Sequence, residues 1–161
     1  MRTTACFAVI AASIGILAAA CDDLEGKSCT EVACNQGIDV SFQYREAGTY
    51  AVEVTVDGEK TTCTATLPLG TEPDANDPCA AKGIYLTRSG SKLPASEQSV
   101  GGLHITSVTV KSLQVRVTRD GDVLGEATYT PEYVVTPGPN GPDCEPKECR
   151  FVSYDLTLVP R

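Results

Sequence analysis

Cysteine is the residue type whose number and spacing point most directly to chemistry in this chain. The 161 residues include eight cysteines, and the spacing Cys-x4-Cys occurs twice. Thiols of this kind can form disulfides, bind zinc or carry a lipid. Cys6 and Cys21 lie in or directly after an uncharged N-terminal stretch. The remaining cysteines are even in number, as expected for disulfides in an oxidising compartment: Cys29, Cys34, Cys63, Cys79, Cys144 and Cys149.

The pairing of these six cysteines is open at the level of sequence. One alternative cross-pairs the two Cys-x4-Cys units, which would join the first ordered residues to the last strand. Another is a four-thiolate zinc site, which we disfavour because thiolates outside the cytoplasm tend to oxidise before they bind metal. The simplest scheme is three local pairs: Cys29–Cys34, Cys63–Cys79 and Cys144–Cys149.

Two further groups of residues could carry chemistry, and neither is specific. His104 is the single histidine, but it lies in an apolar strand pattern and no Gly-x-Ser-x-Gly segment accompanies it. We therefore expect a partly exposed strand residue rather than a catalytic one. Asp74, Asn76 and Asp77 form a weak calcium candidate, although Pro78 follows and ordinary turn chemistry explains the same residues. We expect no metal and no cofactor.

Residues 1–20 have the three parts of a secretory signal: a positive start at Arg2, an apolar middle and small residues at the end. The segment Ala18-Ala19-Ala20-Cys21 resembles the lipobox of bacterial lipoproteins. That resemblance implies that Cys21 receives a diacylglyceryl thioether and becomes an N-terminus acylated with a fatty acid such as palmitate. The alternatives are an ordinary signal, which would leave Cys21 as a spare thiol, and an uncleaved membrane span, for which the apolar part is short.

The sequence predicts a signal peptide at 1–20, a lipidated tether at 21–28 and a single domain at 29–161. From Cys21 to Cys29 the chain reaches at most ~28 Å, so the domain would sit close to the bilayer. Loss of Arg2 with the leader changes the formal charge from −8 to −9. A domain this acidic is a poor partner for nucleic acid, which requires clustered Lys and Arg.

Alternation of apolar and polar residues dominates the chain after residue 34 and predicts strands. The turn dipeptides Asp57-Gly58 and Asp120-Gly121 predict two hairpins, and Pro131 places the next segment at an edge or bend. Residues 68–82, 88–99 and 136–149 are predicted loops, of which the last is a candidate contact surface. No helical period occurs after residue 20, so we predict an antiparallel β-sandwich of about 7–9 strands. The expected strands cover residues 38–44, 50–56, 63–67, 83–87, 103–110 (one or two strands), 113–117, 123–129 and 152–158.

The segment 46–56 resembles the Gly-x-Tyr corner of immunoglobulin-like domains, with Tyr50 at the tyrosine and Val52 where a cysteine would follow. The resemblance implies an immunoglobulin-like sandwich. Here the segment belongs to the second strand and the chain has no Trp, so the strand topology would differ from that of a true immunoglobulin domain. The whole chain is similar to small lipoproteins of Gram-negative envelopes, a family label that names a location and an architecture rather than an activity.

These features predict a lipid-anchored envelope protein that is not an enzyme and that acts as a binding or structural module. Its partners would be the membrane, through the lipid, and an envelope or extracellular protein. Asp22 after the lipidated cysteine resembles an inner-membrane retention signal of some bacteria, while either membrane and either face remain open. The alternatives are an assembly or apolar-ligand carrier accessory, which requires a cavity between the sheets, and a hydrolase, which lacks the residues.

Overall fold

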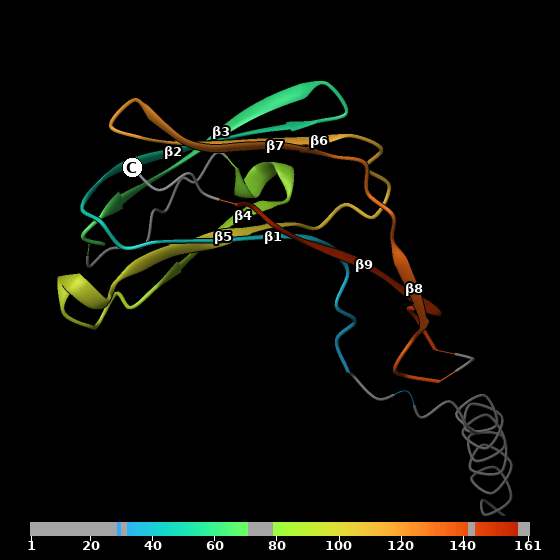
Figure 1. Ribbon diagram of the computed structural model, residues 1–161. Coiled ribbons are helices and arrows are strands. Elements are labelled where there is room, and N and C mark those ends of the chain that lie inside the picture. The colour runs from blue at the N-terminus through green and yellow to red at the C-terminus, as the bar shows by residue number, and fades with distance from the viewer. Residues whose placement is uncertain (1–28, 30–31, 71–78, 142–143, 158–161) are drawn as a thin grey trace, which may run out of the picture. The chain divides into compact units, whose positions relative to one another are not determined.

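The computed structural model describes residues 29, 32–70, 79–141 and 144–157 (Figure 1). The chain divides into two compact units, which we treat separately. One comprises Cys34–Thr136 and Glu148–Arg161, and the other comprises Met1–Ala33 and Pro137–Lys147.

Strands form most of the first unit, and two short 3₁₀ turns, η2 (Ala80–Lys82) and η3 (Ala95–Glu97), are the helical elements in the described residues. The strands are β1 (Gly37–Tyr44), β2 (Gly48–Val56), β3 (Glu59–Leu67), β4 (Ile84–Ser89), β5 (Ser99–Ile105), β6 (Leu113–Arg119), β7 (Asp122–Tyr129), β8 (Val134–Pro137) and β9 (Glu148–Asp155).

The strands form two sheets that stack face to face, which confirms the predicted β-sandwich (Figure 1). The first sheet has the order β4-β5-β1-β9-β8, and the second has the order β3-β2-β6-β7. Both predicted hairpin turns are present, and Asp57 and Asp120 adopt the positive φ angles that such turns require. β8 comes after Pro131 and lies at a sheet edge, as the proline predicts.

The core lies between the sheets and consists mainly of branched aliphatic side chains. Apolar residues alternate along the expected strands and should form a buried stripe on one face of each. In β2 and β6 the stripe residues Tyr50, Val52, Val54, Leu113, Val115 and Val117 all have 0% exposure, whereas Val56 at the end of β2 is half-buried. The expected stripe of β9 is only partly correct, because Val152 and Tyr154 are half-buried. β9 lies next to the edge strand β8, where the opposite sheet covers it less completely. Leu156 is buried, and Leu158 lies outside the described residues.

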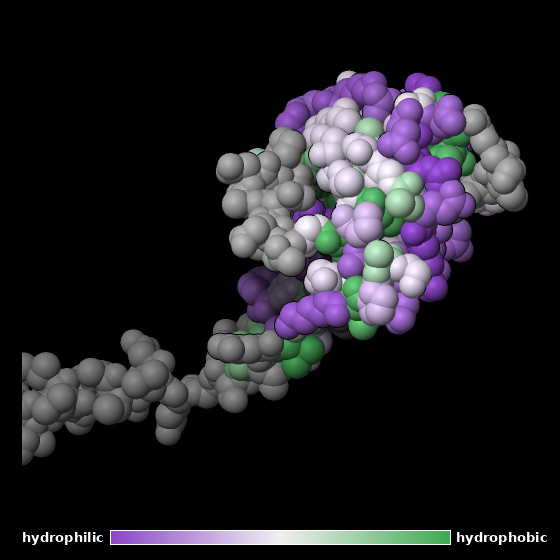
Figure 2. Space-filling view, turned by 90° about the vertical axis from the view of Figure 1, so that its left-hand side faces the viewer, coloured by the Kyte–Doolittle hydropathy of each residue, from purple (hydrophilic) through white to green (hydrophobic). Residues whose placement is uncertain are grey.

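On the side of the sandwich in Figure 2, the described residues are mainly hydrophilic, with hydrophobic residues scattered among them. Such scattered apolar residues are normal for a folded domain.

The strand order matches that of an immunoglobulin-like sandwich, except that the strand in the position of strand A comes from the end of the chain. If β1 is aligned with the second immunoglobulin strand, B, then β4-β5-β1 corresponds to D-E-B and β3-β2-β6-β7 corresponds to C′-C-F-G. β9 then occupies the position of strand A beside β1, but it comes from the end of the chain and runs parallel to β1. This parallel pair departs from the predicted antiparallel arrangement.

The predicted tyrosine corner forms, although on β2 rather than on strand F. The Tyr50 hydroxyl donates a hydrogen bond of 2.6 Å to the carbonyl of Glu46, four residues upstream. Burial raises the pKa of Tyr50. The hydrogen bond satisfies the one polar group of a side chain that is otherwise packed in the core.

Two predicted boundaries are wrong. The apolar positions of 103–110 belong to β5 only as far as Ile105, and Val110 is a buried residue of the connection to β6. The predicted loop 88–99 is shorter than expected, because β4 continues to Ser89 and β5 begins at Ser99. Gln98, at the end of this loop, is buried because its side chain is hydrogen-bonded to backbone groups. Its side chain accepts a hydrogen bond from the Leu69 amide and donates one to the Leu93 carbonyl.

The burial pattern predicts how β2 responds to truncation. Val54→Ala removes two methyl groups from a fully buried site and should lower the free energy of unfolding by ~1–3 kcal/mol. Thr55→Ala, on the opposite face, is the matched control and should cost little. Glu53→Ala should also cost little, because its ion pair with Lys60 is solvent-exposed. Chemical denaturation measures all three, and a larger loss for Glu53→Ala than for Val54→Ala would reverse the assigned faces.

Candidate functional site

Three disulfides connect the six cysteines, each with a Cα–Cα distance of 5.7 Å. The predicted Cys63–Cys79 pair is confirmed. The predicted local pairs Cys29–Cys34 and Cys144–Cys149 are wrong, because the two Cys-x4-Cys units are cross-paired. The observed bonds of these units are Cys29–Cys144 and Cys34–Cys149.

The parallel pairing of β1 with β9 explains the cross-pairing. Ile38 lies opposite Val152, an offset of 114 positions along the chain. Both cross-pairs have a sequence separation of 115. Two segments that run in the same direction can form two successive bridges only if their cysteines have equal spacing. The repeated Cys-x4-Cys spacing was therefore the sequence signal for this pairing.

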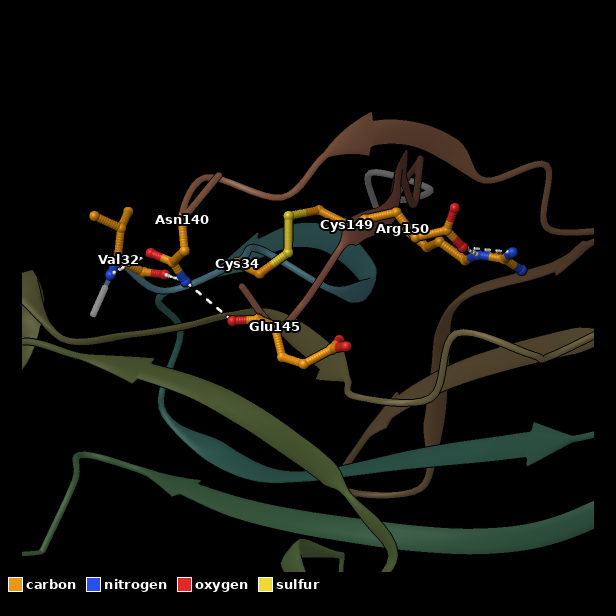
Figure 3. The surroundings of a disulfide bond; sticks show 7 residues. Val32, Cys34, Asn140, Glu145, Cys149 and Arg150 are labelled. Atoms are coloured by element: carbon orange, nitrogen blue, oxygen red, sulfur yellow. Dashed lines mark hydrogen bonds and ion pairs between the residues drawn. A yellow bond between two sulfur atoms is a disulfide. The ribbon is translucent and has the colours of Figure 1, made fainter. Parts of the chain in front are cut away.

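In the second unit, the loop after β8 binds the N-terminal segment. The backbone N–H of Val32 donates to Asn140 Oδ1 at 3.0 Å, and Asn140 Nδ2 donates to the Val32 carbonyl at 3.2 Å. The same Nδ2 donates to the Glu145 carbonyl at 3.2 Å. Figure 3 shows the Asn140 side chain between Val32 and Glu145. One amide side chain thus forms hydrogen bonds with both the backbone N–H and the backbone carbonyl of Val32, as a neighbouring strand would.

The predicted contact loop 136–149 also makes contacts within its own unit. The segment from Gly138 to Lys147 closes on itself through a hydrogen bond from the Gly138 amide to the Lys147 carbonyl, 2.8 Å long. A side chain at Gly138 would clash with the carbonyl of Pro146. Together with Cys29–Cys144, these contacts make the loop an attachment point for Cys29 and Val32.

The cross-paired disulfides should be energetically coupled. Either one alone closes a loop of about 115 residues in the unfolded chain, worth ~5 kcal/mol, whereas the second then closes a ring of only about 12 residues, worth ~3 kcal/mol. Removing Cys29–Cys144 or Cys34–Cys149 alone, as a paired Cys→Ala variant, should therefore cost ~3 kcal/mol, and removing both should cost ~8 kcal/mol.

Denaturant unfolding of the two single-bridge variants and the double-bridge variant measures this coupling. The control removes Cys63–Cys79, whose separation is 16, and its cost should add to that of either other bridge. Costs of the two cross-pairs that simply add would contradict the shared loop, and peptide mapping that finds Cys29 bonded to Cys34 would contradict the pairing.

His104 lies on the outer face of the first sheet, as expected for a partly exposed strand residue. Its Nδ1 is 2.7 Å from Asp39 Oδ1 on β1. The strand register places Tyr85 on the other side of His104 and places Ser153 next to Asp39. A Ser-His-Asp site requires the serine beside the histidine. Here the carboxylate lies between them, so the row supports a hydrogen-bonded pair rather than a nucleophile.

A hollow on the same outer face was not predicted. It has a volume of about 530 Å³ and lies over β5, where Gly101 contributes no side chain. The β-bulge of β5 falls here, since the register of β4 and β5 shifts between Thr87 and Arg88. We call this hollow the Gly101 trough. Its lining residues are Ser41, Phe42, Gln43, Ser89, Ser99, Gly101, Asp155 and Leu156.

The outer face of the second sheet differs from this one in its charges. Glu53 on β2 forms ion pairs with Lys60 at 2.6 Å and with Arg116 at 3.9 Å. The hydrogen bond from Lys60 holds the pKa of Glu53 below its usual value. These charged groups therefore pair with one another across neighbouring strands of the sheet.

The described residues bear on only some of the predictions about metal binding and the membrane. Among the described residues, no group of three or more His, Cys, Asp or Glu side chains is placed to bind a metal ion. The calcium candidates Asp74, Asn76 and Asp77 lie outside the described residues, as does Cys21. Of the helices in the described part of the chain, none is long and apolar enough to span a bilayer.

Comparison of the chain with protein-family models, with curated proteins and with solved structures finds no match. The function must therefore be argued from the residues and their geometry.

Proposed function

We propose that the mature chain is a lipid-anchored lipoprotein of a bacterial envelope, attached through Cys21, that acts as a non-catalytic binding or structural module. The observation that carries the proposal is the pair of disulfides at the ends of the chain. Cys29, eight residues after Cys21, is bonded to Cys144, and Cys34 is bonded to Cys149. A lipid on Cys21 would thus be coupled by covalent bonds to both ends of the polypeptide.

The disulfides also support an exported location. Three bridges in one chain require an oxidising compartment, and a secretory leader with a lipobox at residues 18–21 delivers the chain to one. The acidic composition disfavours nucleic acid as a partner.

The packing of the core favours a scaffold over an apolar-ligand carrier. Side chains from both sheets form one cluster, in which Tyr50, Leu113 and Val115 have 0% exposure. A carrier would require an apolar cavity between these same side chains. The Gly101 trough lies instead on the outer face, where polar groups surround it.

Mass spectrometry of the N-terminus tests the proposal. The protein expressed in a Gram-negative bacterium should begin at Cys21, carry a diacylglyceryl thioether and partition with membranes. Cys21→Ser should remain in the soluble or uncleaved fraction, while Ser28→Ala, in the same tether, is the control and should behave as the wild type. A free amine and unmodified thiol at Cys21 would contradict the lipid anchor.

A further inference from the structure

The Gly101 trough has walls and a floor that come from different strands. Ser89 on β4 and Ser41 and Gln43 on β1 flank β5, and Gly101 lies between them. A Cβ built on Gly101 would lie 3.8 Å from the Thr87 side chain of β4, which shows that the missing side chain points to the outer face. The trough is therefore a strip of bare backbone on an otherwise side-chain-covered sheet.

Gly101 and Gly102 are adjacent in β5, but the structure requires glycine at only one of these two positions. Gly102 has a φ of +142°, and a Cβ there would approach the Val40 carbonyl oxygen to 2.5 Å, so the fold itself requires glycine. Gly101 is outside the left-handed region, and a Cβ there would make only ordinary contacts of 3.8 Å or more. Neither the backbone nor the packing excludes alanine at this position. Glycine within a strand often marks a β-bulge, which is present here, or a place where a ligand approaches the backbone.

The lining selects the chemistry of a ligand. Ser41 and Ser89 offer hydroxyl groups, Gln43 offers an amide and Asp155 offers a carboxylate, so donors and acceptors are mixed. Ser99 is buried, and its hydroxyl oxygen lies 2.7 Å from that of Ser89, so it positions the Ser89 hydroxyl rather than facing a ligand. None of the residues that line the trough is Lys or Arg, which leaves an anionic ligand without a counter-charge. An apolar ligand has little to contact, because the side chains of Phe42 and Leu156 are buried in the core.

An exposed aromatic residue continues the same surface. Tyr85 is 48% exposed and lies on β4, four residues before Ser89 and on the same face. The distance along the strand is ~14 Å, a length that a short oligosaccharide spans. Tyr85 offers a flat ring and a hydroxyl, which together suit the apolar face and polar edge of a sugar ring. His104 and Asp39 lie in the same row and add polar groups.

We propose that the Gly101 trough, together with Tyr85, binds a neutral oligosaccharide. Hydroxyl groups that both donate and accept match the mixed lining, and the volume of about 530 Å³ falls within the ~300–1,000 Å³ of small-molecule sites. The inference rests on the proposed function in that it supplies a ligand class for a binding module, but it does not depend on the lipid.

Backbone NMR of the ¹⁵N-labelled full-length chain tests the site directly. Cellotriose, maltotriose and triacetylchitotriose serve as neutral probes, with glucuronic acid as an anionic probe and ethylenediamine as a cationic probe. At least one neutral trisaccharide should shift the Gly101 and Gly102 amide signals in a saturable manner, whereas the anionic and cationic probes should not.

Variants separate the trough from the rest of the surface. Gly101→Val fills the trough and should raise the Kd at least tenfold, and Gly101→Ala, which introduces no close contact, should raise it less. Tyr85→Ala should also weaken binding, while Thr64→Ala on the outer face of the second sheet is the control and should leave the Kd unchanged. Thermal unfolding of the Gly101 variants should stay close to that of the wild type.

The inference is overturned if no neutral trisaccharide shifts Gly101, if Gly101→Ala and Gly101→Val bind as the wild type does, or if only the cationic probe shifts these signals. Its failure is separable from failure of the proposed function. Loss of sugar binding in a lipidated chain contradicts the site alone, and an unlipidated Cys21 in a chain that binds sugar contradicts the anchor alone.

Discussion

The pairing of β1 with β9 is the interaction on which the rest of the structure depends. β1 lies in the centre of the first sheet, and without β9 one of its edges would be unpaired. Because β9 comes from the end of the chain, this sheet is complete only when both ends have met. Such a contact is costly in chain entropy, and the two cross-paired disulfides offset that cost by holding the ends together in the unfolded state.

The residues before β1 are also cross-linked. Cys29 is held to the loop after β8 by its disulfide with Cys144, and Val32 is held there by the hydrogen bonds of its backbone to Asn140. Residues 34–44 continue into β1. A pull on a lipid at Cys21, as we propose, would thus be transmitted through the chain to the Cys29–Cys144 disulfide. The Gly101 trough, which we propose as a ligand site, is lined by residues of the sandwich unit alone.

Local patterns in the sequence predict most of the strands but not how they are arranged. The alternation of Tyr50, Val52 and Val54 depends only on the two-residue period of a strand, and the buried face was correct. Val152 and Tyr154 show the same period, yet they are half-buried, because burial also depends on a strand's place in the sheet. The pairing of Cys34 with Cys149 required knowledge that β9 runs parallel to β1, which no local pattern contains. The trough was missed for a related reason. Gly101 can be seen in the sequence, but its neighbours Ser41 and Ser89 are brought beside it only by the strand order.

Hydrogen exchange of the full-length, oxidised chain tests the central claim most directly, because it reports whether β9 is a strand of the sheet. The account predicts that the amides of β9 that bond to β1 exchange as slowly as those of β1 itself, since the two strands should open together. Exchange of the β9 amides at the rate of exposed loop residues, while β1 and β5 stay protected, would contradict it.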